Sequence, residues 1–194
     1  MLTAIQLIFA PFRTWEKISL ARRGVVWVLL VSLLPLLLAS VAVEGYSLIH
    51  WGEKRGGFSM VIKASPSAGI RYSVTHAVLL LSSVVIGAKF LQWVTQSFQI
   101  QTSFAPCFSV MAYGFSPIFL GRFLDAVPAL NTWVCWGLGA LLSISVLYHG
   151  IGLVLRPEQT KGFGIYLFSA IMVTLSSLLS HFIAVAFLYG RTRF

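Results

Sequence analysis

Five long stretches of this chain are almost free of charged side chains, and each is long enough to cross a lipid bilayer as a helix. A spanning helix needs roughly 20 mainly apolar residues. Because lipid cannot satisfy backbone N–H and C=O groups, such stretches fold as helices. The sequence therefore predicts an all-α, polytopic integral membrane protein with five transmembrane helices, at about residues 24–43, 73–93, 104–121, 132–155 and 163–189.

The overall composition agrees with this fold class. The chain is 58% hydrophobic and 10% charged, whereas soluble proteins have about a quarter charged residues. Its net charge of +9 invites comparison with nucleic-acid-binding proteins. However, the lysines and arginines lie at the edges of the apolar stretches, which is typical of anchors beside lipid headgroups. We expect the lipid bilayer as a partner and no nucleic acid.

Residues 1–20 form a separate amphipathic segment before the transmembrane domain, which occupies residues 21–194. Apolar residues recur at spacings of three and four, so one helical face is apolar. We predict an interfacial helix that Pro11 breaks in two, with Pro11 and Trp15 as interfacial anchors and Trp15 at headgroup depth. Packing of this segment against the helix bundle is an equally open alternative.

Five spans place the two termini on opposite sides of the membrane. Lysines and arginines tie at seven on each side, so their number does not fix the orientation. Arg22 and Arg23 adjoin the first span, which usually dominates orientation. We expect a bacterial inner membrane, with the N-terminus in the cytoplasm and the C-terminus, which carries Arg191 and Arg193, outside.

Two further features concern the helices and their connections. Small residues recur four apart, which allows helices to approach closely in lipid; examples are Gly139 with Ser143 and Ser176 with Ser180. The longest polar stretch, residues 44–72, predicts a flexible loop between the first two spans.

The third span contains the most unusual residues. Pro117 removes a backbone donor and clashes with the preceding turn, which bends a helix. Gly114 and Ser116 permit close packing at the bend, and Tyr113 adds a polar group. The pattern predicts a kinked central helix gripped by its neighbours, with these four residues as a packing, partner or lipid site.

Three motifs resemble those of the Yip-domain family. Tyr113-Gly114-Phe115-Ser116 before Pro117 resembles its tyrosine, glycine, aromatic, serine signature. Residues 11–18 look like the lead-in of short bacterial members, and Trp136 with Tyr148-His149-Gly150 resembles the fourth-span pattern. The family consists of five-span proteins named for interaction with small Rab-type GTPases. The resemblance covers nearly the whole chain in span count and order, and implies a shared fold and topology.

Only some properties of the family are expected to hold for this chain. GTPase-binding eukaryotic members have a long polar N-terminal domain and an aspartate, leucine, tyrosine, glycine, proline motif, and neither is found here. We therefore do not expect Rab-type GTPase binding. By family analogy the protein organises membranes or partner proteins.

Arg122 and Asp125 lie three residues apart, so on a helix they share a face and can form an ion pair. They are candidates for binding a lipid headgroup or a protein partner. The alternative is a helix end whose charges reach the aqueous surface, as exposed pairs commonly do.

His76, His149 and His181 lie inside predicted spans, where ionisable residues are functional candidates. Their spacing matches no metal motif, and we predict no metal, cofactor or catalytic residue. A pairing of His181 with Ser116 in a hydrolase lacks an oxyanion site. Packed histidines that donate to neighbouring carbonyl or hydroxyl groups are the favoured interpretation.

These patterns predict a non-enzymatic membrane protein, a scaffold or accessory subunit that binds other membrane proteins, itself or lipids. The alternative is a small transporter or channel that uses the kinked third helix. Transporters need acidic residues or paired broken helices inside the membrane. In this interpretation every acidic residue lies at the end of a span, which favours the first function.

Overall fold

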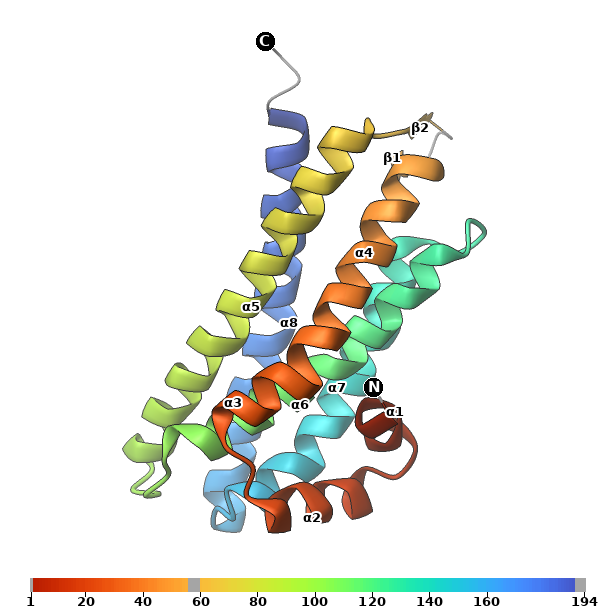
Figure 1. Cartoon of the computed structure of the whole chain (residues 1–194). Helices are drawn as coiled ribbons and strands as arrows, with labels where there is room; N and C mark the ends of the chain where they lie inside the picture. Colours follow the sequence, from red (N-terminus) through yellow and green to blue (C-terminus); the bar gives the residue numbers. More distant parts are fainter. Residues whose placement is uncertain (1, 56–59, 191–194) are drawn as a thin grey trace.

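The computed structural model describes residues 2–55 and 60–190, and it is a bundle of long helices (Figure 1). Within this part, five helical segments are long and apolar enough to cross a membrane: Val25–His50, Pro66–Ser97, Phe104–Ala126, Thr132–Val154 and Gln159–Leu188. The predicted fold class and number of spans are therefore confirmed. Several helices are longer than the predicted spans, because polar helical turns extend beyond the apolar stretches.

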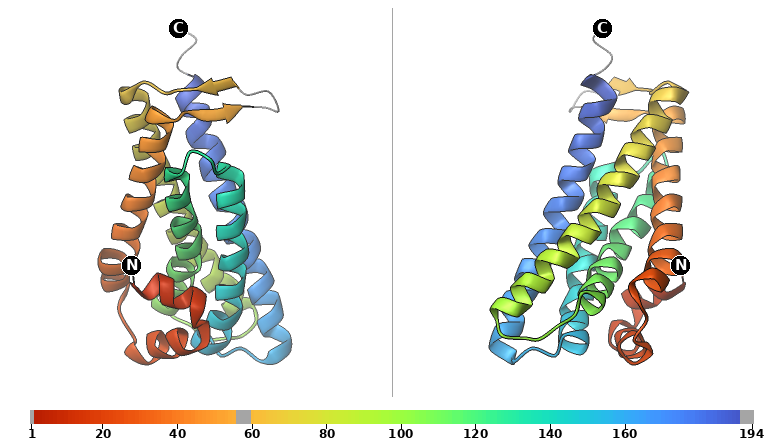
Figure 2. Two further views of the ribbon diagram at one scale, coloured as in Figure 1. Left: turned by 90° about the vertical axis from the view of Figure 1, so that its right-hand side faces the viewer. Right: turned by 60° about the vertical axis from the view of Figure 1, so that its left-hand side comes forward.

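The N-terminal segment forms two short helices, α1 (Leu2–Phe9) and α2 (Pro11–Ala21). The break falls at Ala10 and Pro11, as predicted, because proline is compatible with the first turn of a helix but not its interior. Both helices lie against one end and side of the bundle (Figures 1 and 2).

Of the two alternatives for the N-terminal segment, the Trp15 side chain adopts the second, packing against the bundle. Trp15 is 0% exposed, and its indole N–H donates to the Val146 carbonyl at 2.8 Å. A Cβ added at Gly150 would lie 2.5 Å from the indole ring, so that glycine makes room for it. The indole finds both apolar cover and a hydrogen-bond acceptor inside the protein, which favours docking over exposure to lipid.

The contacts of Trp15 should contribute to the stability of the folded protein. Replacing Trp15 with phenylalanine should lower the free energy of unfolding by about 1 kcal/mol, since a buried hydrogen bond is lost. Trp15→Ala should cost about 3–5 kcal/mol because a large cavity forms as well. Thermal or denaturant unfolding in mild detergent measures both effects. Trp51→Phe is the control, because Trp51 is 45% exposed; equal effects of the two phenylalanine variants would contradict the docking.

The first span consists of three consecutive helical segments. These are α3 (Val25–Trp27), a π-helical stretch η1 (Val28–Leu33) and α4 (Leu34–His50). Pro35 lies in the first turn of α4, where its missing N–H would disrupt regular α-helical bonding to the preceding turn. The π-helical stretch directly before it accommodates the proline without ending the span.

The predicted loop at residues 44–72 is mostly ordered structure. α4 continues to His50, a two-stranded antiparallel hairpin of β1 (Glu53–Arg55) and β2 (Met60–Ile62) follows, and α5 (Pro66–Ser97) begins soon after. Residues 56–59 of this predicted loop lie outside the described residues, as do Arg191 and Arg193 of the C-terminal tail. The hairpin caps the end of the bundle at which α4 stops (Figure 2).

The third span lies at the centre of the bundle. It comprises α6 (Phe104–Arg122) and a 3-10 turn η2 (Phe123–Ala126). Of its most apolar window 78% is buried, against 33–39% for the other four spans. It packs against α4, α5 and α7 (Thr132–Val154), while α8 (Gln159–Gly190) packs mainly against α5 and α7. The prediction of a central helix enclosed by its neighbours describes this arrangement.

Glycines bring α6 and α7 into direct backbone contact. A Cβ on Gly139 would lie 2.8 Å from the Ile118 Cα, and one on Gly121 would lie 2.7 Å from the Cys135 carbonyl oxygen. Such close approach is typical of helices that pack in lipid through small residues. The C-terminal part of α7 packs against α2, and the start of α8 lies at the same end of the bundle, whereas the last described turn of α8 lies at the opposite end (Figure 1).

Candidate functional site: a buried charged cluster

A carboxylate lies inside the first span. Glu44 belongs to α4, six residues before its end, and is 4% exposed. Our expectation that Glu44 begins a polar loop and that every acidic residue lies at a span end is therefore wrong. A buried carboxylate is tolerated only with charged and hydrogen-bonding partners, and three other helices supply them here.

The first partners come from α5 and α8. The Nδ1–H of His76 donates to Glu44 Oε2 at 2.8 Å, and the Tyr72 hydroxyl donates to Glu44 Oε1 at 2.7 Å. His181 Nδ1 lies 3.0 Å from the Tyr72 oxygen and 3.3 Å from Glu44 Oε1. Because the Tyr72 proton points to Glu44, the His181 Nδ1–H donates to the tyrosine oxygen.

The third span contributes the remaining charges. Arg122 Nη1 lies 3.2 Å from Glu44 Oε1 and 3.4 Å from Asp125 Oδ2. Arg122 and Asp125 are each 4% exposed. The predicted ion pair thus exists, but the alternative of surface-exposed charges is wrong, because Glu44 draws the guanidinium inward. We call these six residues the charged cluster: Glu44, Tyr72, His76, Arg122, Asp125 and His181.

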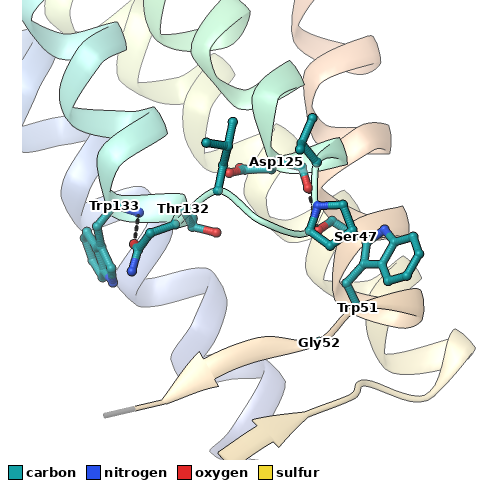
Figure 3. A pocket seen from close by; sticks show the side chains of 10 residues that line it. Ser47, Trp51, Gly52, Asp125, Thr132 and Trp133 are labelled. Atoms are coloured by element: carbon teal, nitrogen blue, oxygen red, sulfur yellow. Dashed lines mark hydrogen bonds between the residues drawn. The ribbon is translucent and has the colours of Figure 1, made fainter. Parts of the chain in front are cut away.

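Two adjoining cavities lead from one end of the bundle to this cluster. The outer one has a volume of about 250 Å³ and is lined by residues of α4, the η2–α7 connection and the start of α7. In Figure 3, Trp51 and Trp133 lie on opposite sides of this cavity, and Ser47 lies next to Asp125, where its hydroxyl donates to the Asp125 carbonyl at 2.8 Å. The inner one, about 20 Å³, is lined by Glu44, Tyr72, Asp125 and His181 among others.

Two polar atoms of the cluster are unsatisfied. His76 Nε2 and Asp125 Oδ1 are buried and lack a hydrogen-bond partner in the described part of the chain. An orphaned buried polar atom costs about 1–3 kcal/mol. With neutral histidines, the two carboxylates and one guanidinium leave one net negative charge. The arrangement can therefore accept a proton or a small cation.

The other predicted site residues lie inside the bundle. Tyr113, Gly114, Ser116 and Pro117 are all buried on α6. The Tyr113 hydroxyl is 3.1 Å from the Ser32 hydroxyl, its ring meets Trp15 edge to face, and a Cβ on Gly114 would collide with Leu147. In this structure these four residues contact the protein's own helices rather than lipid or another chain.

The hypothetical serine–histidine pair is not assembled. The Ser116 hydroxyl donates to the Tyr113 carbonyl at 2.7 Å, whereas His181 bonds to the charged cluster. In the described residues no hydrogen bond joins Ser116 to His181. The third intramembrane histidine, His149, is only partly buried, and it donates from Nδ1 to the Ser145 carbonyl at 3.0 Å.

Sequence reasoning missed Glu44 as a site residue, although the sequence contains a relevant pattern. Apolar residues continue after Glu44 to Trp51, without a proline and with only Gly45 as a weak breaker. A span that continues through Glu44 needs buried cationic or hydrogen-bonding partners. His76, His181 and Arg122 were all recognised as intramembrane or membrane-edge groups, but their convergence depends on helix packing.

A second group of charges lies at the opposite end. A cavity of about 470 Å³ between α2, α6 and α7 is lined by Arg22, Arg23 and Arg156 together with Ser103 at the N-terminus of α6. No ion pair engages these arginines in the described part of the protein. Helix N-termini and unpaired arginines both favour anions.

The comparison with known protein families gives a match over residues 5–188, nearly the whole chain, to the Yip1 domain. The chain belongs to the Yip1 domain family. The resemblance seen in the sequence motifs is thereby confirmed, and the five spans of the structure agree with it. No curated protein and no solved structure matches the chain.

Membership of the Yip1 family, together with the five apolar helices, makes this a multi-pass integral membrane protein. In the structure, the family-like motif residues Tyr113, Gly114 and Trp15 meet at the contact between α2, α6 and α7. Hence the motifs that carry the resemblance serve the packing of this Yip1 domain, whereas the charged cluster is built from other residues.

Proposed function

We propose that this Yip1 domain protein is a non-enzymatic scaffold or accessory subunit that binds other membrane proteins or lipids. The observation that carries the proposal is the enclosed central helix, cross-linked at one end to α4, α5 and α8 by the charged cluster. Phe108, Phe115 and Phe119 of the central helix are each at most 1% exposed, so large apolar side chains fill the interior around it in the described part of the bundle. Partner proteins or lipids would then bind to the outer faces and the ends of the bundle.

The proposal extends to orientation and location. The end that carries α2 also carries Arg22, Arg23 and Arg156, and basic residues next to spans favour the cytoplasmic side. We place this end in the cytoplasm of a bacterium and the charged cluster toward the outer face of its inner membrane.

Photo-crosslinking tests the partner. A photoreactive residue is introduced singly at Leu38, Val78, Leu141 or Leu179, which lie on four different spans and are 56%, 58%, 66% and 57% exposed. We expect one recurring protein adduct from one or two neighbouring faces, because a specific interface occupies a limited patch. The control position is Val146, on the same helix as Leu141 but 2% exposed. Lipid adducts alone at all four exposed positions would contradict the accessory role.

Binding of lipid at the arginine-lined cavity is the other half of the proposal. This cavity lies at one end of the bundle, next to the start of α6, and three arginines line it. These features suit a phosphate-bearing headgroup. Native mass spectrometry of the protein purified in mild detergent tests this binding, because it counts the lipids that the protein retains. Anionic phospholipid should be retained by the wild type and lost in Arg22→Gln/Arg156→Gln, whereas equal retention would count against this half.

A transporter or channel is the alternative function, and one observation favours it. Charged residues buried within spans often belong to transport pathways, and the charged cluster is reached from one aqueous end. Against it, Tyr113 and Pro117 line neither of the two cavities and are packed against neighbouring helices. Solute flux in proteoliposomes that is abolished by Glu44→Gln would promote this alternative over the scaffold.

A further inference from the structure

We propose that Glu44, His76 and His181 form a binding site for a transition-metal dication, with Zn²⁺ as the best chemical match. The three side chains come from α4, α5 and α8 and are all buried. One donor atom from each lies within 4.8 Å of the others. The proposal goes beyond the accessory role and does not depend on it.

The spacing of the donors is close to that of a zinc site. Four ligands about 2.1 Å from a tetrahedral Zn²⁺ lie roughly 3.4 Å from one another. Glu44 Oε2 is already 2.8 Å from His76 Nδ1, and Glu44 Oε1 is 3.3 Å from His181 Nδ1. Small rotations of the two imidazoles would complete the triangle of ligands without moving the helices.

The second ring nitrogen of His76 leaves the first one able to bind a metal. His76 is 1% exposed, yet its Nε2 has no hydrogen-bond partner among the described residues. A neutral imidazole in a polar cluster therefore has binding capacity that the protein does not use. When Nδ1 binds the metal, the ring proton moves to Nε2, and this N–H can donate to a water, as the second nitrogen of metal-bound histidines usually donates to an outer partner.

The surroundings supply the remaining requirements. The inner cavity of about 20 Å³ adjoins Glu44 and His181 and has room for one water as a fourth ligand. The outer cavity gives an entry path, and the buried Asp125 lines both. Its Oδ1 has no hydrogen-bond partner in the described part of the structure, so it can hold that water.

The charge balance also permits a dication. Arg122 competes for Glu44 because its Nη1 lies 3.2 Å from Oε1, but it also pairs with Asp125 at 3.4 Å. When a metal takes Glu44, the guanidinium keeps a carboxylate partner. Two imidazoles and one carboxylate favour Zn²⁺ over Mg²⁺ or Ca²⁺, which prefer oxygen ligands alone.

Zinc binding by the purified, tag-free protein in mild detergent tests the site, with Zn²⁺ added alone to metal-free buffer. We expect one Zn²⁺ per chain and a higher unfolding temperature with zinc, since a ligand of the folded state stabilises it. His76→Gln and His181→Gln should each weaken binding at least tenfold and abolish the shift. His149→Gln is the matched control, because His149 lies on α7 and bonds only to Ser145 in the described structure.

Cobalt substitution in the wild type keeps the test decisive if the histidine variants fold poorly. Co²⁺ bound by two histidines and a carboxylate in a four-coordinate site gives intense visible absorption bands, which excess Zn²⁺ should remove and excess Mg²⁺ should not. Absence of retained Zn²⁺ in the wild type, octahedral-type weak cobalt bands, or an equal loss in His149→Gln would overturn the proposal.

Discussion

Replacing Glu44 with alanine should lower the free energy of unfolding by about 3–5 kcal/mol, because it leaves the Arg122 charge buried without its main partner. The guanidinium would keep only Asp125 at 3.4 Å. The Tyr72 hydroxyl and the His76 Nδ1–H would also lose their acceptor. Denaturant unfolding in detergent, followed by circular dichroism, measures the loss.

A double-mutant cycle separates the ion pair from the other contacts. Arg122→Ala combined with Glu44→Ala should cost less than the sum of the single variants, because the second substitution removes a charge that has already lost its main partner. Glu158→Ala is the control, since its pair with Lys161 at 3.0 Å is largely exposed and should contribute under about 1 kcal/mol. Equal effects of Glu44→Ala and Glu158→Ala would show that the cluster does not hold the bundle together.

Gly139→Leu should disrupt the contact between α6 and α7 and cost about 3 kcal/mol or more. Even a Cβ at this position would lie 2.8 Å from the Ile118 Cα and 3.0 Å from the Pro117 carbonyl oxygen. These are backbone atoms, so only separation of the helices relieves the overlap, and overpacking of this kind is strongly destabilising. Loss of the monodisperse peak in size-exclusion chromatography after mild heating is the readout.

The same helix offers a matched control for this substitution. Gly137 lies two residues earlier on α7, and nothing lies within 4 Å of a Cβ built there. Gly137→Leu makes the same change in helix propensity and hydrophobicity but creates no overlap. Its unfolding should stay within about 0.5 kcal/mol of the wild type, and a loss as large as that of Gly139→Leu would contradict the proposed backbone contact.

The sequence was sufficient to predict the fold, because lipid restricts the chain to helices of a known length. The helix break at Pro11 and the central position of the third span could also be predicted, because both depend on residue types within the segment itself. Small residues at Gly139 and Ser143 indicated close packing, although not which helix they meet. The structure adds the partner, the backbone of α6 around Ile118.

The charged cluster could not be predicted from local pattern. Glu44, His76, Arg122 and His181 lie on four helices, and their sequence separations contain no information about which faces turn inward together. Hydropathy ended the first span before Glu44, because an unpaired carboxylate is costly in lipid. Its cost is offset here by residues up to 137 positions away, which only tertiary packing brings into contact.

The burial of α6 bears on how the protein enters the membrane. The most apolar window of Phe104–Ala126 has a mean hydropathy of 1.4, the lowest of the five spans, whereas that of Val25–His50 reaches 2.6. A helix so weakly apolar, with Arg122 and Asp125 at its end, partitions poorly into lipid by itself. During synthesis we therefore expect α6 to remain at the insertion machinery until α7 has been made. The two helices should then enter the lipid together as a helical hairpin.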